Sequence, residues 1–266
     1  TGTGGTHVCQ RTFDAEGVFE RVRDYDVSYM CGAPTVLNNL IKYYEQEDDV
    51  VTTGDRDVRI ATAGSAPATA TIETIEDEFD WRIIHIYGLT ETAPIITTSN
   101  SPRRLAERGR DLKVKQGFET LATDVRVVDE DGNDVARDGA TIGEIVVAGN
   151  QVMDRYLNKP EITEEAFNDR VEGYFHTGDL ATIDEDGMVS IQDRKKDIIV
   201  SGGENISSIE VENVLYEHPA VSAAAVIPAP SEQYGETVKA FVVPASGDPE
   251  RPGVSAEELT EFTRER

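Results

Sequence analysis

The chain is poor in basic residues, in cysteine and in long apolar runs. Its 25 Lys and Arg residues stand against 51 Asp and Glu, which gives a formal net charge of −26. Nucleic acids and anionic membrane surfaces would repel such a protein, so small molecules are the expected partners. No apolar run is long enough to span a bilayer, and no signal peptide is evident at the start. Cys9 and Cys31 are too few for a disulfide framework and lack metal-ligand spacing, which predicts a reducing, cytoplasmic location.

Apolar residues nevertheless recur at regular periods along this acidic chain, which predicts a folded protein rather than disorder. A length of 266 residues allows one large domain or two modest ones. An acidic, lysine-poor surface also suits a cytoplasm rich in salt, because screening weakens the repulsion between like charges. We therefore advance the hypothesis that the protein is halophilic.

Three glycines lie among the first five residues, where a phosphate-binding loop could be sought. Gly2, Gly4 and Gly5 do not complete a G-x-G-x-x-G motif, and no Lys-Ser/Thr pair follows them. A turn that leads into a strand at residues 7–11 is the better interpretation.

The next hundred residues alternate helical and extended patterns. Asp14 is expected to cap one helix and Pro34 to begin a second. Strands are predicted at residues 58–63 and 81–86, with a further helix between them. This β-α-β-α order predicts an α/β sheet with helices on its faces and ligands at the strand ends.

From about residue 120 the pattern changes to short strands joined by turns. Asp131-Gly132 and Asp186-Gly187 are turn signals between strands predicted at 124–128, 144–148, 180–183 and 188–192. After Arg194 a strand, a helix capped by Ser207, strands at 223–227 and 239–243 and a helix capped by Ser255 are expected.

The predicted fold class is therefore α/β with a β-rich subdomain, followed by a small α+β C-terminal domain. The larger domain is expected to cover residues 1–193, with the α/β part ending near 119 and the β-rich part covering 120–193. The smaller domain is expected to cover residues 194–266 and to be incomplete, because both ends of the chain look cut.

The segment that follows the predicted strand 81–86 carries ligand-binding side chains. Tyr87 offers a flat face for a base, Thr90 a hydroxyl for a phosphate oxygen, and Glu91 a hard carboxylate suited to Mg²⁺. A Tyr-Gly pair after a strand is also common as simple packing followed by a turn. The small residues 64–67 occupy the equivalent exit of the preceding strand, with Pro67 expected at the first position of a helix.

A second group of polar residues lies between positions 173 and 205. Asp179 follows Gly178 in a predicted turn, where its short carboxylate would face outward and could accept two hydrogen bonds from a ribose diol. The run Arg194-Lys195-Lys196 places three positive charges in an otherwise acidic chain. His85 and His176 are interpreted as packed or hydrogen-bonded neighbours rather than catalytic bases.

Five ordered blocks together resemble the AMP-forming acyl-CoA synthetases of the adenylate-forming superfamily, and the resemblance covers nearly the whole chain. The forms of residues 203–206 and 31–34 look most like the fatty-acyl or aryl-acid branch. The blocks are Ala63-Gly64-Ser65-Ala66-Pro67, Tyr87-Gly88-Leu89-Thr90-Glu91-Thr92, Gly143-Glu144 through Tyr156-Leu157-Asn158-Lys159-Pro160-Glu161, Tyr174-Phe175-His176-Thr177-Gly178-Asp179, and Asp193-Arg194-Lys195-Lys196-Asp197 with Ser201-Gly202-Gly203-Glu204-Asn205.

The resemblance implies a role for individual residues. Thr90 and Glu91 would act at the α-phosphate and at Mg²⁺, and Lys196 would be the hinge about which the small domain rotates. Gly202, Gly203 and Glu204 would enter the site with coenzyme A. The implied nucleotide-binding residues are Gly64, Ser65, Ala66, Pro67, Tyr87, Gly88, Thr90, Asp179 and Arg194.

The same resemblance implies ATP, a carboxylic acid and coenzyme A as substrates of a ligase in fatty acid metabolism. An acyl-adenylate would form first and an acyl-CoA thioester second. Two family elements are absent from the sequence: the Lys-containing loop that holds the ATP β- and γ-phosphates, and the lysine of the Pro-Lys-Thr-x-x-Gly-Lys motif. We therefore expect a fragment with impaired adenylation. A non-catalytic nucleotide- or acyl-CoA-binding remnant, a carrier-loading adenylation domain and a luciferase-like enzyme remain as alternatives.

Overall fold

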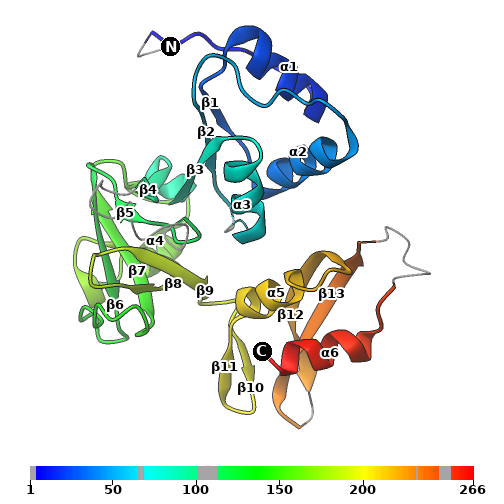
Figure 1. The fold of residues 1–266 in the computed structure, drawn as a ribbon. Coiled ribbons are helices and arrows are strands. Elements are labelled where there is room, and N and C mark those ends of the chain that lie inside the picture. The colour runs from blue at the N-terminus through cyan, green and yellow to red at the C-terminus, as the bar shows by residue number, and fades with distance from the viewer. Residues whose placement is uncertain (1–3, 65–66, 68, 101–112, 232, 246–252) are drawn as a thin grey trace. The chain divides into compact units, whose positions relative to one another are not determined.

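The computed structural model describes residues 4–64, 67, 69–100, 113–231, 233–245 and 253–266 (Figure 1). The chain divides into two compact units. Unit 1 comprises Thr1–Asp124 and Gly149–Met153, and unit 2 comprises Val125–Ala148 and Asp154–Arg266. The domain boundary predicted after residue 193 falls inside unit 2 and stays a prediction.

Unit 1 is an α/β structure built on the five-stranded sheet β1-β2-β3-β4-β5. Strands β1 to β3 are parallel, and β4 and β5 continue the sheet antiparallel. Its elements are α1 (Ala15–Tyr25), β1 (Tyr29–Cys31), α2 (Pro34–Gln46), β2 (Val58–Thr62), α3 (Thr69–Asp77), β3 (Trp81–Gly88), the 3-10 turn η1 (Thr90–Thr92), β4 (Ile95–Thr98) and β5 (Phe118–Glu119).

The core of unit 1 forms where α1, α2 and α3 pack on one face of β2 and β3, as Figure 1 shows. Phe79 lies at its centre, with its ring 5.3 Å from that of Phe19 and 5.4 Å from that of Trp81. The indole Nε1 of Trp81 donates to the carbonyl of Thr52 at 2.6 Å. Burial of these large apolar side chains drives the helices onto the sheet.

Unit 2 contains two antiparallel four-stranded sheets, with strand orders β6-β7-β8-β9 and β11-β10-β13-β12. Helices α5 and α6 pack with the second sheet around Ile199, Leu215 and Leu259. The elements are β6 (Thr123–Val128), β7 (Gly143–Gly149), α4 (Pro160–Ala166), the 3-10 turn η3 (Asp169–Val171), β8 (Phe175–Ile183), β9 (Val189–Arg194), β10 (Ile199–Ser201), β11 (Glu204–Ile206), α5 (Ser208–Tyr216), β12 (Val221–Ser231), β13 (Gly235–Pro244) and α6 (Ala256–Arg264).

The predicted helix caps are confirmed. Asp14 accepts a hydrogen bond from the Gly17 amide at 2.6 Å, and α2 begins at Pro34. Ser207 and Ser255 each accept a bond from the amide three residues on, at 3.1 Å. These side chains satisfy amides that the first turn of a helix leaves without an intrahelical partner.

Two local predictions in unit 1 are wrong. Residues 7–11 form no strand, since no neighbouring strand in the described part of the chain pairs with them. Pro67 is not the first residue of a helix, because α3 begins at Thr69. Within the described residues, the helices are too short or too polar to cross a membrane.

Candidate functional site

The end of β3 and the loop after it form the candidate nucleotide segment of unit 1. Gly88 approaches the backbone so closely that a Cβ atom there would lie 1.7 Å from the carbonyl oxygen of Pro94. A glycine is therefore required where the chain turns back into β4. The buried Thr92 hydroxyl accepts from the Leu89 amide at 3.1 Å and lies 3.0 Å from the Leu89 and Pro94 carbonyls. These contacts fix the loop.

Thr90 and Glu91 in this loop are more exposed to solvent than Tyr87 at the end of β3. Thr90 is exposed and Glu91 half-buried, and the Glu91 carbonyl accepts from the Met153 amide at 2.7 Å. Tyr87 is only 9% exposed, so most of its side chain packs within the unit. A single half-buried carboxylate fits Mg²⁺, which is commonly bound through one or two carboxylates together with substrate phosphates. Among the described residues, no cluster of three or more His, Cys, Asp or Glu side chains could hold a metal ion without such help.

The exit of β2 is only partly described. Gly64 is exposed and adopts φ +101°, a conformation that favours glycine, while Pro67 is buried. Ser65 and Ala66, predicted to line the adenine pocket, lie outside the described residues.

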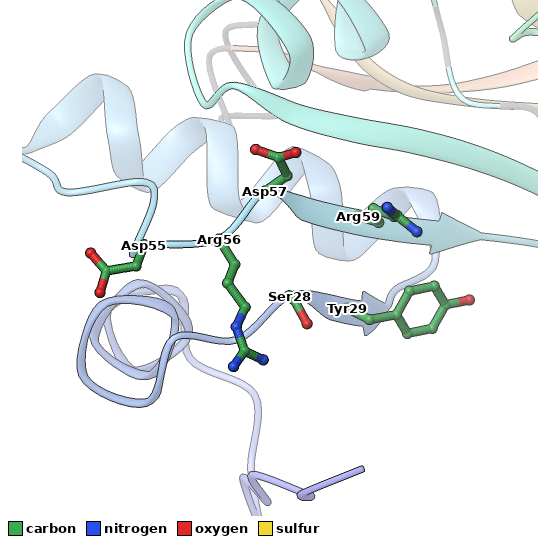
Figure 2. Close-up of a pocket in the computed structure, with 6 residues that line it drawn as sticks. All are labelled: Ser28, Tyr29, Asp55, Arg56, Asp57 and Arg59. Carbon is green, nitrogen blue, oxygen red and sulfur yellow. The ribbon is translucent and has the colours of Figure 1, made fainter. Parts of the chain in front are cut away.

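An open hollow of 470 Å³ lies elsewhere in unit 1 (Figure 2). It is lined at the amino ends of β1 and β2, where Arg56 pairs with Asp26 at 3.0 Å. The predicted nucleotide residues follow the carboxyl ends of β2 and β3, the edge at which parallel α/β sheets bind ligands. We therefore assign no nucleotide role to this hollow. Its lining residues are Ser28, Tyr29, Asp55, Arg56, Asp57 and Arg59.

Asp179 lies in unit 2, within β8, and not in the predicted turn. Strand β9 pairs with it in register at Arg194, and the Arg194 Nε lies 3.6 Å from Asp179 Oδ1. The Asp179 side chain is 9% exposed and that of Arg194 58%. The expectation of an outward-facing carboxylate in a turn is wrong, because Asp179 lies in a paired strand and its side chain is mostly buried. The structure does bring the two predicted nucleotide ligands together.

A buried ionic cluster supports this strand segment, and sequence reasoning gave it no role. The carboxylate of Glu144 on β7 bonds to Arg170, and lies 3.3 Å from His176 Nδ1 and 3.8 Å from Lys195 Nζ. Its Oε1 also accepts from the Gly178 amide at 3.3 Å. Burial raises the pKa of the Glu144 carboxyl, but the hydrogen bonds from Arg170 and His176 outweigh burial and leave this pKa below its usual value.

The two histidines of interest are buried. His85 is 2% exposed, and burial lowers its pKa to about 4 although the carbonyls of Val114 and Lys115 oppose the shift. His176 is 8% exposed, and burial is also the largest cause of its lowered pKa. Both side chains are packed in the structure, in agreement with their interpretation as packed or hydrogen-bonded neighbours.

The predicted hinge and coenzyme A residues follow β9 in unit 2. Lys196 is exposed in a turn closed by the Asp197 amide, which donates to the Arg194 carbonyl at 2.9 Å. Gly202 and Gly203 join β10 to β11 with φ values of +61° and +93°, a left-handed turn that favours glycine. Together with Glu204 they are exposed. The hairpin tip is therefore exposed, although the Gly202 amide donates to the Tyr234 carbonyl at 2.9 Å.

Comparison with known proteins gives the same assignment for both ends of the chain. Residues 1–157 match the profile of the AMP-binding enzyme family, and residues 210–266 match that of the AMP-binding enzyme C-terminal domain. Probable acyl-activating enzyme 6 of Arabidopsis thaliana is 44% identical over 99% of this chain, and 2-methylpropanoate–CoA ligase CCL4 of Humulus lupulus is 40% identical over 99%. The chain spans 47% of the length of each, about half.

Solved structures agree with this result. Amide bond synthetase McbA of Marinactinospora thermotolerans superimposes with a TM-score of 0.81 at 29% identity, covering 99% of this chain and 50% of that one. The o-succinylbenzoate CoA synthetase of Bacillus subtilis, in complex with its acyl-adenylate intermediate, gives a TM-score of 0.77 at 28% identity and covers 97% of this chain and 48% of that one. The chain therefore belongs to the AMP-binding enzyme family, with the fold of the adenylate-forming enzymes.

Proposed function

We propose that the chain belongs to an acid–CoA ligase and supplies the AMP-binding and hinge parts of its site. The observation that carries the proposal is the Asp179–Arg194 pair, a carboxylate and a guanidinium held side by side on β8 and β9. The carboxylate can accept hydrogen bonds from a ribose diol, and the guanidinium can donate to the same nucleotide. Relatives named as CoA ligases or acyl-activating enzymes support this assignment.

In the proposed reaction the chain binds and orients the nucleotide. Thr90 would donate its hydroxyl to an α-phosphate oxygen, and Tyr87 and residues 64–67 would contact the adenine. Glu91 would hold Mg²⁺, which when bound supplies positive charge between the phosphate oxygens. The loop of Gly202, Gly203 and Glu204 would then accompany coenzyme A after rotation at Lys196.

Carboxylic acids of the fatty or aryl class are the proposed substrates. Relatives are named for acetate and for 2-methylpropanoate, and a structural neighbour for o-succinylbenzoate. Without the phosphate loop and the Pro-Lys-Thr-x-x-Gly-Lys lysine, this chain should bind AMP yet adenylate poorly. We propose a cytoplasmic location from the two unpaired cysteines, although two relatives are named as peroxisomal.

The diol assignment predicts a preference that calorimetry can measure. AMP should bind about 100-fold more tightly than 2′,3′-dideoxy-AMP, because the analogue lacks the hydroxyls that Asp179 would bind. ATP–pyrophosphate exchange with fatty and aryl acids should stay at background for this chain. Equal affinity for the two nucleotides would refute the diol assignment, and robust exchange would refute the expectation of impaired adenylation.

The charge balance predicts that the thermal stability of the chain depends on salt concentration, on the hypothesis that the protein is halophilic. A net charge of −26 destabilises the folded state through repulsion, and salt screens it. The melting temperature followed by circular dichroism should rise from dilute buffer to molar KCl. A melting temperature that does not rise would count against the hypothesis.

A further inference from the structure

A buried carboxylate joins the end of β9 to the start of α5. Asp193 is 1% exposed, and its Oδ2 accepts from the Ser208 amide at 2.6 Å and from the Ser208 hydroxyl at 3.0 Å. Its Oδ1 accepts from the Arg194 amide at 2.7 Å. Hydrogen bonds to a charged acceptor are short and strong, so this contact is a specific link. We call it the Asp193–Ser208 clamp.

A second bond runs beside the clamp. The Ser207 hydroxyl donates to the Gln192 carbonyl at 2.9 Å and also accepts from the Glu210 amide as the cap of α5. Residues 192–193 are thus bound to residues 207–208 through two adjacent side chains. The helix start and the strand end behave as one structural element.

These two hydrogen bonds constrain the segment between Asp193 and Ser207. Lys196 and the β10–β11 hairpin lie within residues 194–206, whose ends the two bonds hold together. A change of backbone torsion at Lys196 cannot carry α5 away from β9 while both bonds persist. Rotation about Lys196 therefore requires the clamp to open.

We propose that Asp193 is a positioning residue whose clamp on Ser208 holds the segment 194–266 against β9 and opens when this segment turns. The functional role of this rotation rests on the proposed function, whereas the existence of the clamp follows from its hydrogen bonds alone. Opening would expose the Asp193 carboxylate to water, so the lost hydrogen bonds would be replaced by solvation. The hydrogen bonds to the buried carboxylate make the closed arrangement specific. Because water can solvate the carboxylate when the clamp opens, the closed arrangement is also reversible.

The test is a distance measurement by double electron–electron resonance on the full chain. Cys9 and Cys31 are replaced by serine, and spin labels are attached at Glu130→Cys and Glu257→Cys, two exposed positions on either side of the clamp. The parent chain should give one dominant distance. The experiment contains no nucleotide, so its outcome is independent of AMP binding.

Two variants remove the clamp in different ways. Asp193→Ala deletes the acceptor, and Ser208→Pro deletes both donors of residue 208. Proline is favoured at the first position of a helix, and Ser207, with φ −72° and ψ 126°, has the extended conformation that precedes proline. Each variant should raise the population outside the dominant distance by about tenfold relative to the parent.

Asp138→Ala is the matched control. Its carboxylate also accepts from two amides, those of Ala140 and Thr141 at 2.8 and 2.7 Å, but within its own loop. It should leave the distance distribution unchanged. An unchanged distribution in Ser208→Pro, with folding verified by circular dichroism, overturns the clamp even if Asp193→Ala does not fold. An equal change in the control also overturns it.

Discussion

Replacing Asp179 with alanine is expected to weaken AMP binding by about 100-fold, the largest functional effect that the structure predicts. The proposed contact comprises two hydrogen bonds from ribose hydroxyls to a carboxylate, and bonds to charged groups contribute more than neutral ones. The Asp179 side chain is 9% exposed and lies 3.6 Å from the Arg194 Nε, so its position is largely fixed before a ligand binds. Isothermal titration calorimetry with AMP measures the loss directly.

The nucleotide analogue turns this measurement into a double-mutant cycle. If Asp179 binds the diol, Asp179→Ala should bind AMP and 2′,3′-dideoxy-AMP with equal affinity. Glu185→Ala is the matched control, since Glu185 is an exposed carboxylate in the turn between β8 and β9. Its affinity for AMP should equal that of the parent chain. A folded Asp179→Ala variant with parental AMP affinity would contradict the assignment.

Local sequence signals predicted α1, α2, α3, α5 and α6 because the decisive contacts are local, whereas α4 was not predicted. Asp14, Ser207 and Ser255 each bind an amide three residues away, so the residue type alone indicates the helix start. Strands β1, β4 and β5 were not predicted. They contain 3, 4 and 2 residues, too few for a periodic pattern, and they exist because distant strands pair with them.

The candidate site also contains features that local sequence signals predicted and features that they did not. The loop of Thr90 and Glu91 could be predicted because it directly follows a buried strand. The covered state of Asp179 could not, since it depends on pairing with Arg194, fifteen residues on by numbering. The role of Glu144 was also missed, because its partners Arg170 and His176 are distant in sequence and each is an ordinary charged or polar residue when considered alone.

Glu144→Ala is expected to lower the free energy of unfolding of unit 2 by about 3–5 kcal/mol, the cost of removing one partner from a buried ionic cluster. Arg170 would then keep its charge in a site where its Nε already has no hydrogen-bond partner among the described atoms. The Gly178 amide would lose its acceptor too, which should loosen the segment that carries Asp179. AMP affinity should therefore fall together with stability.

The chain offers an internal reference for this experiment. Trp81 is the sole tryptophan and lies in the core of unit 1, so its fluorescence reports the unfolding of that unit. In urea, Glu144→Ala should shift the transition followed by far-UV circular dichroism while the Trp81 transition stays in place. Glu144→Gln should lower the free energy of unfolding by less than Glu144→Ala does, because an amide oxygen can still accept from the Gly178 amide and from Arg170. Removing a contact that stabilises the Asp179 strand must change the urea concentration at the midpoint of unfolding. If both variants unfold at the parental urea concentration, the cluster does not support this strand.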